Sequence, residues 1–239
     1  MIILCNNINM LYVLIWISFI IIFIMFLISF KKYLERRKTY LLVWSLGLFI
    51  GAIAVISFYT FLAFRSSFAF YIYYYLGGGL TPAVLGLGSM YLFGRKSLYT
   101  ISLYLTIILS IIVLIFLLHS HIIYANFNNL INYFSGKIQL NSTISPNGSG
   151  VLLLGSWVVP IAISNTLGSI ELIGVALYST IKAFKRKVFD RMFWGLLILT
   201  ISVFLIASLS TIARLFTPVI FWPSMVIGWL IFFVGFMNL

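Results

Sequence analysis

The chain has 239 residues, of which 63% are hydrophobic and only 8% are charged. A soluble domain carries about 25% charged residues, so this composition excludes an ordinary soluble protein and indicates a polytopic membrane protein. The net charge of +12 would suggest nucleic-acid binding in a soluble protein. Here the basic residues flank apolar runs, as topology determinants do, so we expect no nucleic-acid partner.

Seven apolar stretches predict membrane-spanning helices, because each approaches the ~20 apolar residues that a span requires. Their continuous apolar character excludes the alternating strands of a membrane barrel. The first is interpreted as a retained helix and not a signal peptide, since the basic segment KKYLERRK follows it. The sequence thus predicts a single all-α transmembrane domain over 1–239 with an outer loop at 119–150. The predicted helices cover about 10–30, 40–63, 68–93, 98–118, 151–181, 192–214 and 218–237.

The basic residues predict the orientation of this seven-helix bundle. The loops after the first, third and fifth helices contain 12 of the 15 basic residues, and such an excess marks the cytoplasmic side. The amino terminus is therefore predicted outside and the carboxyl terminus in the cytoplasm of a multi-pass plasma-membrane protein. Two glycosylation sequons, at Asn141 and Asn147, lie in the predicted outer loop and agree with this orientation.

Small residues mark two of the predicted helices. In the third, four tyrosines precede Gly77, Gly78, Gly79 and Pro82. This pattern fits a kinked helix lining a ligand pocket, or a tyrosine belt followed by a tight packing surface, which we favour. In the second, Gly47 and Gly51 have the GxxxG spacing that seats another helix, either from this chain or from a partner.

Glu171 lies inside the fifth predicted helix and is one of only three acidic residues. Eleven residues separate it from Lys182, roughly 16 Å at ~1.5 Å per residue. That distance places Glu171 near the midplane of a hydrocarbon core ~30 Å thick. An ionisable group at this depth is a candidate functional residue, and desolvation favours its neutral form unless it is paired. By helical spacing, its face is shared by Ser164, Gly168, Val175 and Tyr178, with Asn165 and Ser169 beside them.

Two hypotheses stay open for Glu171. It is either a proton-coupling or ligand-binding carboxyl group, or a protonated hydrogen-bond donor that fixes helix packing. The accompanying candidates for a ligand- or proton-responsive site are Ser164, Asn165 and Tyr178.

At the outer face, Arg65, Tyr74 and Arg214 are candidates for contact with a lipid or quinone head group.

No catalytic motif is visible, and two histidines with three acids leave little for general acid–base chemistry. His119 and His121 are two residues apart, so on a helix they point in different directions and do not share one metal ion. The last helix has no lysine for a retinal Schiff base. We therefore expect neither enzymatic activity, nor a metal, nor a cofactor.

Two segments resemble an uncharacterised family of prokaryotic seven-helix membrane proteins. They are Tyr73–Gly77 with the following LGLG and YL motifs, and Asn165–Gly168 continuing through GVALYS to the basic run. The resemblance implies a seven-helix bundle and no activity, and the high Ile, Tyr and Asn content suits an archaeal or other AT-rich genome. The sequence favours a non-catalytic membrane subunit that packs against partner membrane proteins and contacts lipid or quinone. The alternative is a small proton-coupled carrier or membrane sensor that uses Glu171.

Overall fold

The computed structural model describes residues 8–134, 151, 158–187, 189–215 and 221–238. In this part of the chain the regular secondary structure is helical, in agreement with the predicted all-α class. The elements are α1 (Ile8–Arg36), α2 (Thr39–Phe64), α3 (Ser67–Tyr73), η2 (Tyr74–Leu80), α4 (Thr81–Phe93), α5 (Lys96–Leu118), α6 (Tyr124–Phe134), α7 (Val158–Lys185), α8 (Arg191–Leu215) and α9 (Phe221–Met237).

Five of the described helical segments are long and apolar enough to cross a membrane. They are Met10–Arg36 in α1, α2, the continuous α3–η2–α4 segment, α5, and Val159–Lys185 in α7. Residues Arg191–Ile206 of α8 and all of α9 are shorter apolar helices. The described chain therefore has the features of a multi-pass membrane protein, while the count of seven spans stays a prediction.

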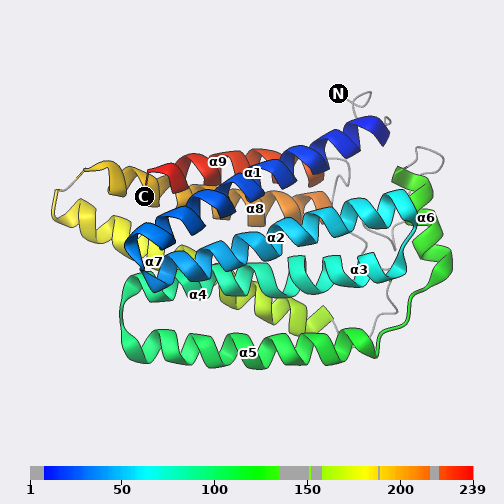
Figure 1. The fold of residues 1–239 in the computed structure, drawn as a ribbon, viewed down its shortest axis with the longest axis horizontal. Coiled ribbons are helices and arrows are strands. Elements are labelled where there is room, and N and C mark those ends of the chain that lie inside the picture. Colours follow the sequence, from blue (N-terminus) through cyan, green and yellow to red (C-terminus); the bar gives the residue numbers. More distant parts are fainter. Residues whose placement is uncertain (1–7, 135–150, 152–157, 188, 216–220, 239) are drawn as a thin grey trace.

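Successive long helices run in alternating directions along the bundle (Figure 1). The α1–α2, α4–α5 and α7–α8 connections lie at the same end, on the left of Figure 1, together with the carboxyl end of α9. The twelve basic residues of the three predicted inner loops lie at or next to these connections. We call this end the basic end.

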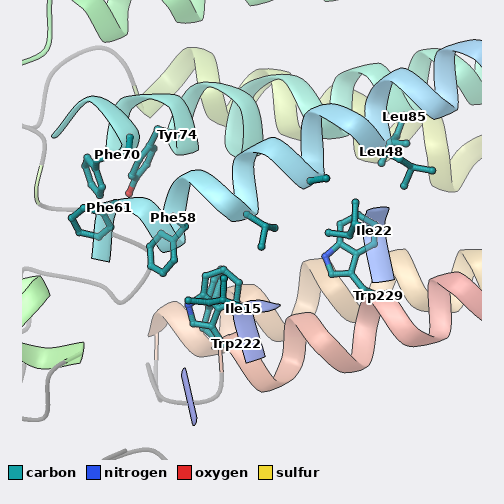
Figure 2. Close-up of a cluster of buried hydrophobic side chains, with 14 of the residues drawn as sticks. Ile15, Ile22, Leu48, Phe58, Phe61, Phe70, Tyr74, Leu85, Trp222 and Trp229 are labelled. Atoms are coloured by element: carbon teal, nitrogen blue, oxygen red, sulfur yellow. The ribbon is translucent and has the colours of Figure 1, made fainter. Parts of the chain in front are cut away.

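The bundle core is built from aromatic and aliphatic side chains of α1, α2, α3, α9 and η2 (Figure 2). Phe58 of α2 is fully buried, and its ring lies 4.9 Å from that of Trp222 on α9. Phe61 similarly packs against Phe70 of α3, with 4.9 Å between the centroids of the tilted rings. Helix α2 lies between its neighbours: α1 contacts it on one side, and the α3–η2–α4 segment contacts it on the other.

The GxxxG motif of α2 packs against α4 of the same chain. A Cβ atom on Gly47 would lie 2.9 Å from Leu85, and one on Gly51 would lie 3.2 Å from Thr81. The two glycines therefore allow close backbone approach. Across the same interface, the indole of Trp44 donates a hydrogen bond to the Leu85 carbonyl at 3.2 Å.

The third predicted span contains a π-helical segment, η2, between α3 and α4. The hydroxyl of Thr81 donates to the Leu76 carbonyl at 2.8 Å and so satisfies an acceptor in this widened turn. Its three glycines serve close packing: Cβ atoms on Gly77, Gly78 and Gly79 would lie 3.0–3.3 Å from Ala54, Ile161 and Val113, respectively. The helix is thus distorted, which the kinked-helix alternative predicted. Its three glycines nevertheless form a tight packing surface, which is part of the alternative that we favoured.

The outer loop at 119–150 contains a helix that was not predicted from the sequence. Helix α6 lies across the end of the bundle opposite the basic end (Figure 1). Its residue Phe127 is buried, with ring centroids 5.1 Å from Phe61 and 6.0 Å from Phe70. A short amphipathic helix is overlooked when only runs of about 20 apolar residues are sought.

The fifth span was predicted to start at residue 151, but residues 152–157 lie outside the described residues, so this boundary stays a prediction. Val151 is a turn residue whose carbonyl accepts a hydrogen bond from the Ile123 amide at 2.7 Å. Helix α7 begins at Val158, which places Pro160 in its first turn, where a missing amide proton costs no hydrogen bond.

Candidate functional site

The carboxyl group of Glu171 is buried at the interface of α7 with α4 and α5. Its side chain is only 8% exposed. On the α4 side it meets Gly86, since a Cβ atom there would lie 3.0 Å from Oε2 of Glu171. One turn away on α7, Gly168 is pressed against the backbone of Pro82 and Ala83. Glycines on both helices therefore create the space that the carboxyl group occupies.

Two hydroxyl groups of α5 face this interface. Ser102 interacts with the Glu171 carboxyl group, and Thr106 lies one turn further along the same face of α5. Both side chains are buried, at 2% and 5% exposure. Neither Ser102 Oγ, Thr106 Oγ1 nor Oε2 of Glu171 has a hydrogen bond of normal geometry to the described residues. The serine is thus near the carboxyl group without being locked to it.

The helix directions fit a compact polar cluster. Helix α7 runs toward the basic end, whereas α5 runs away from it (Figure 1). Side chains tilt toward the amino end of their own helix, so Glu171 points away from the basic end, in the direction from Ser102 to Thr106. We call Glu171, Ser102 and Thr106 the buried oxygen cluster.

The cluster has no compensating charge among the described residues. Within this part of the chain, the Ser102 hydroxyl interacts with the Glu171 carboxyl group, and no ion pair to it is present. No group of three His, Cys, Asp or Glu side chains suited to a metal ion occurs in the described ranges. A buried carboxylate without a countercharge is strongly disfavoured, so this environment favours the neutral acid, which can donate a hydrogen bond.

Ser164, a predicted site residue, joins α7 to the π-helical segment. It is fully buried, and its hydroxyl donates a 2.6 Å hydrogen bond to the Gly79 carbonyl. In a bilayer, where no water replaces such bonds, carbonyls freed by helix distortion are satisfied by neighbouring side chains. Ser164 therefore has a structural partner of its own, about two turns from Glu171.

Two further predicted residues do not join the buried oxygen cluster. Tyr178 is 46% exposed, and its ring meets Phe93 with 5.2 Å between centroids. The Lys182 ammonium lies 5.9 Å from the same tyrosine ring. Asn165 is half-buried beside the helix face that Ser164 and Glu171 share. Tyr178 escapes burial because α4 ends at Phe93, so that helix no longer covers α7 at this level.

The predicted outer residues are also separated. Arg65 is exposed and has left-handed backbone (φ 53°) at the end of α2. Tyr74 is only 7% exposed, and its ring packs 5.0 Å from that of Phe70 inside the bundle (Figure 2). Arg214 belongs to α8, but its side chain lies outside the described residues, as do both sequons, Asn141 and Asn147. Tyr74 thus belongs to the aromatic core, and a head-group contact by the two arginines stays a prediction.

A small void of about 10 Å³ lies on another side of α7, where α2, α4 and α8 meet it. Its walls are mainly apolar, with Trp44 and Leu172 among them. Room for about one water between apolar walls gives no hydrated route, and Glu171 is not part of its lining.

Ser102 and Thr106 were missed by sequence reasoning. Their signal is weak, because α5 also contains Ser97, Thr100 and Ser110, so two hydroxyl residues four positions apart do not stand out. Only the pairing of α5 with α7 gives them significance, and that pairing is a tertiary property.

No family model, curated protein or solved structure matches this chain. The resemblance to a prokaryotic seven-helix family therefore stays a prediction.

Proposed function

We propose that the protein is a non-catalytic integral membrane subunit that binds a partner membrane protein through the exposed face of α7. In this proposal it spans the plasma membrane seven times, with its amino terminus outside. The gathering of three basic connections at one end (Figure 1) supports that orientation through the positive-inside rule.

Polar groups on the membrane-exposed surface of α7 carry the proposal. Thr166 is exposed, and Asn165 and Ser169 are half-buried. None of the three side chains has a hydrogen-bond partner in the described part of the chain. At ~1.5 Å per residue from Lys182, they lie roughly 20–26 Å into the span, within a hydrocarbon core of ~30 Å. Lipid tails do not satisfy such groups, whereas a partner helix does.

The shape of this surface also suits a helix partner. Gly174 is exposed, and a Cβ atom on it would meet nothing within 4 Å. Ile170 and Leu177 stand on either side of it and are 63% and 45% exposed. Small residues between branched ones permit close helix approach. We call Asn165, Thr166, Ser169, Ile170, Gly174 and Leu177 the exposed α7 face.

Co-purification tests the proposal. The protein is isolated from native membranes in mild detergent, as the wild type and as the double variant Thr166→Leu/Ser169→Leu. The variant is compatible with lipid but cannot form the hydrogen bonds, so the proposal expects loss of a partner that the wild type retains.

A matched control is Ile107→Val/Ile111→Val on the exposed side of α5, which should retain the partner. Equal retention by all three proteins, or a wild type that purifies alone, would reject the α7 face as the binding surface.

The buried oxygen cluster favours a second candidate function, a proton-responsive membrane sensor. An acid that exchanges a hydrogen-bond partner on gaining or losing a proton needs acceptors near it that are not already engaged. Ser102 meets this requirement, because it interacts with the carboxyl group and has no hydrogen bond of normal geometry in the described part of the chain.

Glu171→Gln separates the two candidates, because glutamine keeps the size of the side chain and its hydrogen bonding but cannot titrate. The subunit proposal expects normal partner binding at every pH tested. If the protein is a sensor, partner binding should change with pH, and this change should disappear in the Glu171→Gln variant. It should remain in Ser179→Ala, a control variant on the same helix.

A further inference from the structure

Three cationic side chains from two helices converge at the basic end. Lys32 and Arg36 lie one turn apart near the end of α1, and Arg191 begins α8. Lys32 and Arg191 meet at the end of α9, because the Lys32 ammonium lies 5.3 Å from the Phe236 ring centroid and Arg191 donates to the carbonyl of the next residue, Met237. Such convergence is unfavourable unless an anion occupies the space between the cations.

Arg191 is held in place by the end of α9. Its Nε donates to Oδ1 of Asn238 at 3.1 Å, and its Nη2 donates to the Met237 carbonyl at 2.9 Å. The Asn238 amide is itself anchored by a 2.9 Å hydrogen bond to the Val234 carbonyl. The guanidinium group is therefore preorganised, and its remaining N–H donors have no acceptor among the described residues.

Lys32 is placed at the membrane boundary. It is half-buried within the span of α1, and its ammonium lies 5.3 Å from the centroid of the Phe236 ring. Beside it, Met237 is 38% exposed. The cationic groups thus stand next to apolar surface at the end of a helix that is long and apolar enough to cross a membrane.

The acidic residues of this region do not neutralise the three cations. Asp190 caps α8, because its Oδ1 accepts a 2.9 Å hydrogen bond from the Phe193 amide. Glu35 is exposed on α1. The described part of the chain shows no ion pair between an acidic residue and Lys32.

We propose that Lys32, Arg36 and Arg191 form a binding site for the phosphate of an anionic phospholipid in the leaflet at the basic end. Basic pockets between membrane helices bind such head groups, and an arginine fork matches the phosphate oxygens. The adjacent apolar surface distinguishes a lipid from free phosphate. The site is separate from the exposed α7 face, so its test is independent of the proposed function.

Lipid titration tests the site. The purified full chain in neutral detergent is titrated with phosphatidylglycerol, with phosphatidylcholine and with inorganic phosphate. Bound lipid is counted by native mass spectrometry, and thermal unfolding is followed in parallel. We expect one phosphatidylglycerol to bind in preference to phosphatidylcholine and to raise the unfolding temperature, with no comparable effect of inorganic phosphate.

Charge variants locate the site. Lys32→Gln/Arg191→Gln should weaken phosphatidylglycerol binding about 30-fold, which is about 2 kcal/mol at about 1.4 kcal/mol per tenfold, since each near-surface charge contributes about 1 kcal/mol. The control Lys96→Gln/Lys185→Gln removes the same charge from exposed positions and should change binding less than about threefold. Lys32→Arg keeps the charge and should keep the affinity.

Three results would overturn the site: equal binding of both lipids by the wild type, equal weakening by the two double variants, or stabilisation by inorganic phosphate that matches phosphatidylglycerol. The comparison of the two lipids on the wild type tests the site even where a variant does not fold.

Discussion

The closest contact between α4 and α7 gives the sharpest prediction of the structure. Gly168 has no room for a side chain, because its Cβ would collide with the backbone of Pro82 and Ala83. Backbone atoms cannot rotate away as a side chain does, so Gly168→Ala must move one helix away from the other. Gly174, six residues further along the same helix, has open space within 4 Å of its Cβ position.

The magnitudes follow from this contrast. Overpacking of a close interface costs about 1–3 kcal/mol, and a clash with fixed backbone places Gly168→Ala at the upper end. The shift would also separate the Glu171 carboxyl group from Gly86 and disturb the buried oxygen cluster. By contrast, Gly174→Ala exchanges glycine for a better helix former, a change of about 1 kcal/mol in favour of the helix.

Thermal unfolding in detergent, followed by tryptophan fluorescence, measures the unfolding temperatures of the Gly168→Ala and Gly174→Ala variants. Gly168→Ala should unfold at a clearly lower temperature than the wild type, whereas Gly174→Ala should match or exceed the wild type. Equal behaviour of the two variants would refute the close approach of α4 and α7, and with it the burial of Glu171.

Other positions give further expectations. Ser164→Ala should destabilise the bundle by about 0.6–2 kcal/mol, the range for hydrogen bonds between membrane helices, in the same unfolding assay. Glu171→Lys should prevent stable folding, because its ammonium would be buried without a partner, whereas Glu171→Gln should fold; comparable yields after gel filtration would contradict this. Phe127→Ala should destabilise by up to about 3–5 kcal/mol and expose α6 to limited proteolysis. If the sequons are outside and modified in a eukaryotic host, Asn141→Gln and Asn147→Gln should each increase electrophoretic mobility, and unchanged mobility after glycosidase treatment of the wild type would mean that neither is used.

The burial of Glu171 against other helices was accessible from the sequence, because it follows from the helical spacing of the polar residues around it. The residues that surround Glu171 could not be predicted from the sequence. Gly86 and Ser102 belong to other helices, and their contact with Glu171 depends on how α4, α5 and α7 pair. The periodicity of one helix contains no information about its neighbours.

Other differences have equally local causes. Helix α6 is too short for a search by span length, although Phe127 anchors it firmly. Tyr178 has the helical spacing of the α7 face that contains Ser164 and Glu171, but it lies where α4 ends and is therefore exposed. The sequence likewise left open whether the GxxxG motif of α2 binds a partner, and contacts of Gly47 with α4 show that it packs within the chain.

Photocrosslinking in native membranes tests the central claim, that the exposed α7 face binds a membrane protein, most directly. A diazirine amino acid replaces Thr166 on α7 or, as the control, Ile111 on α5, since both positions are exposed. We predict a discrete protein adduct from position 166 and only lipid adducts from position 111. Lipid adducts alone from both positions would contradict the claim.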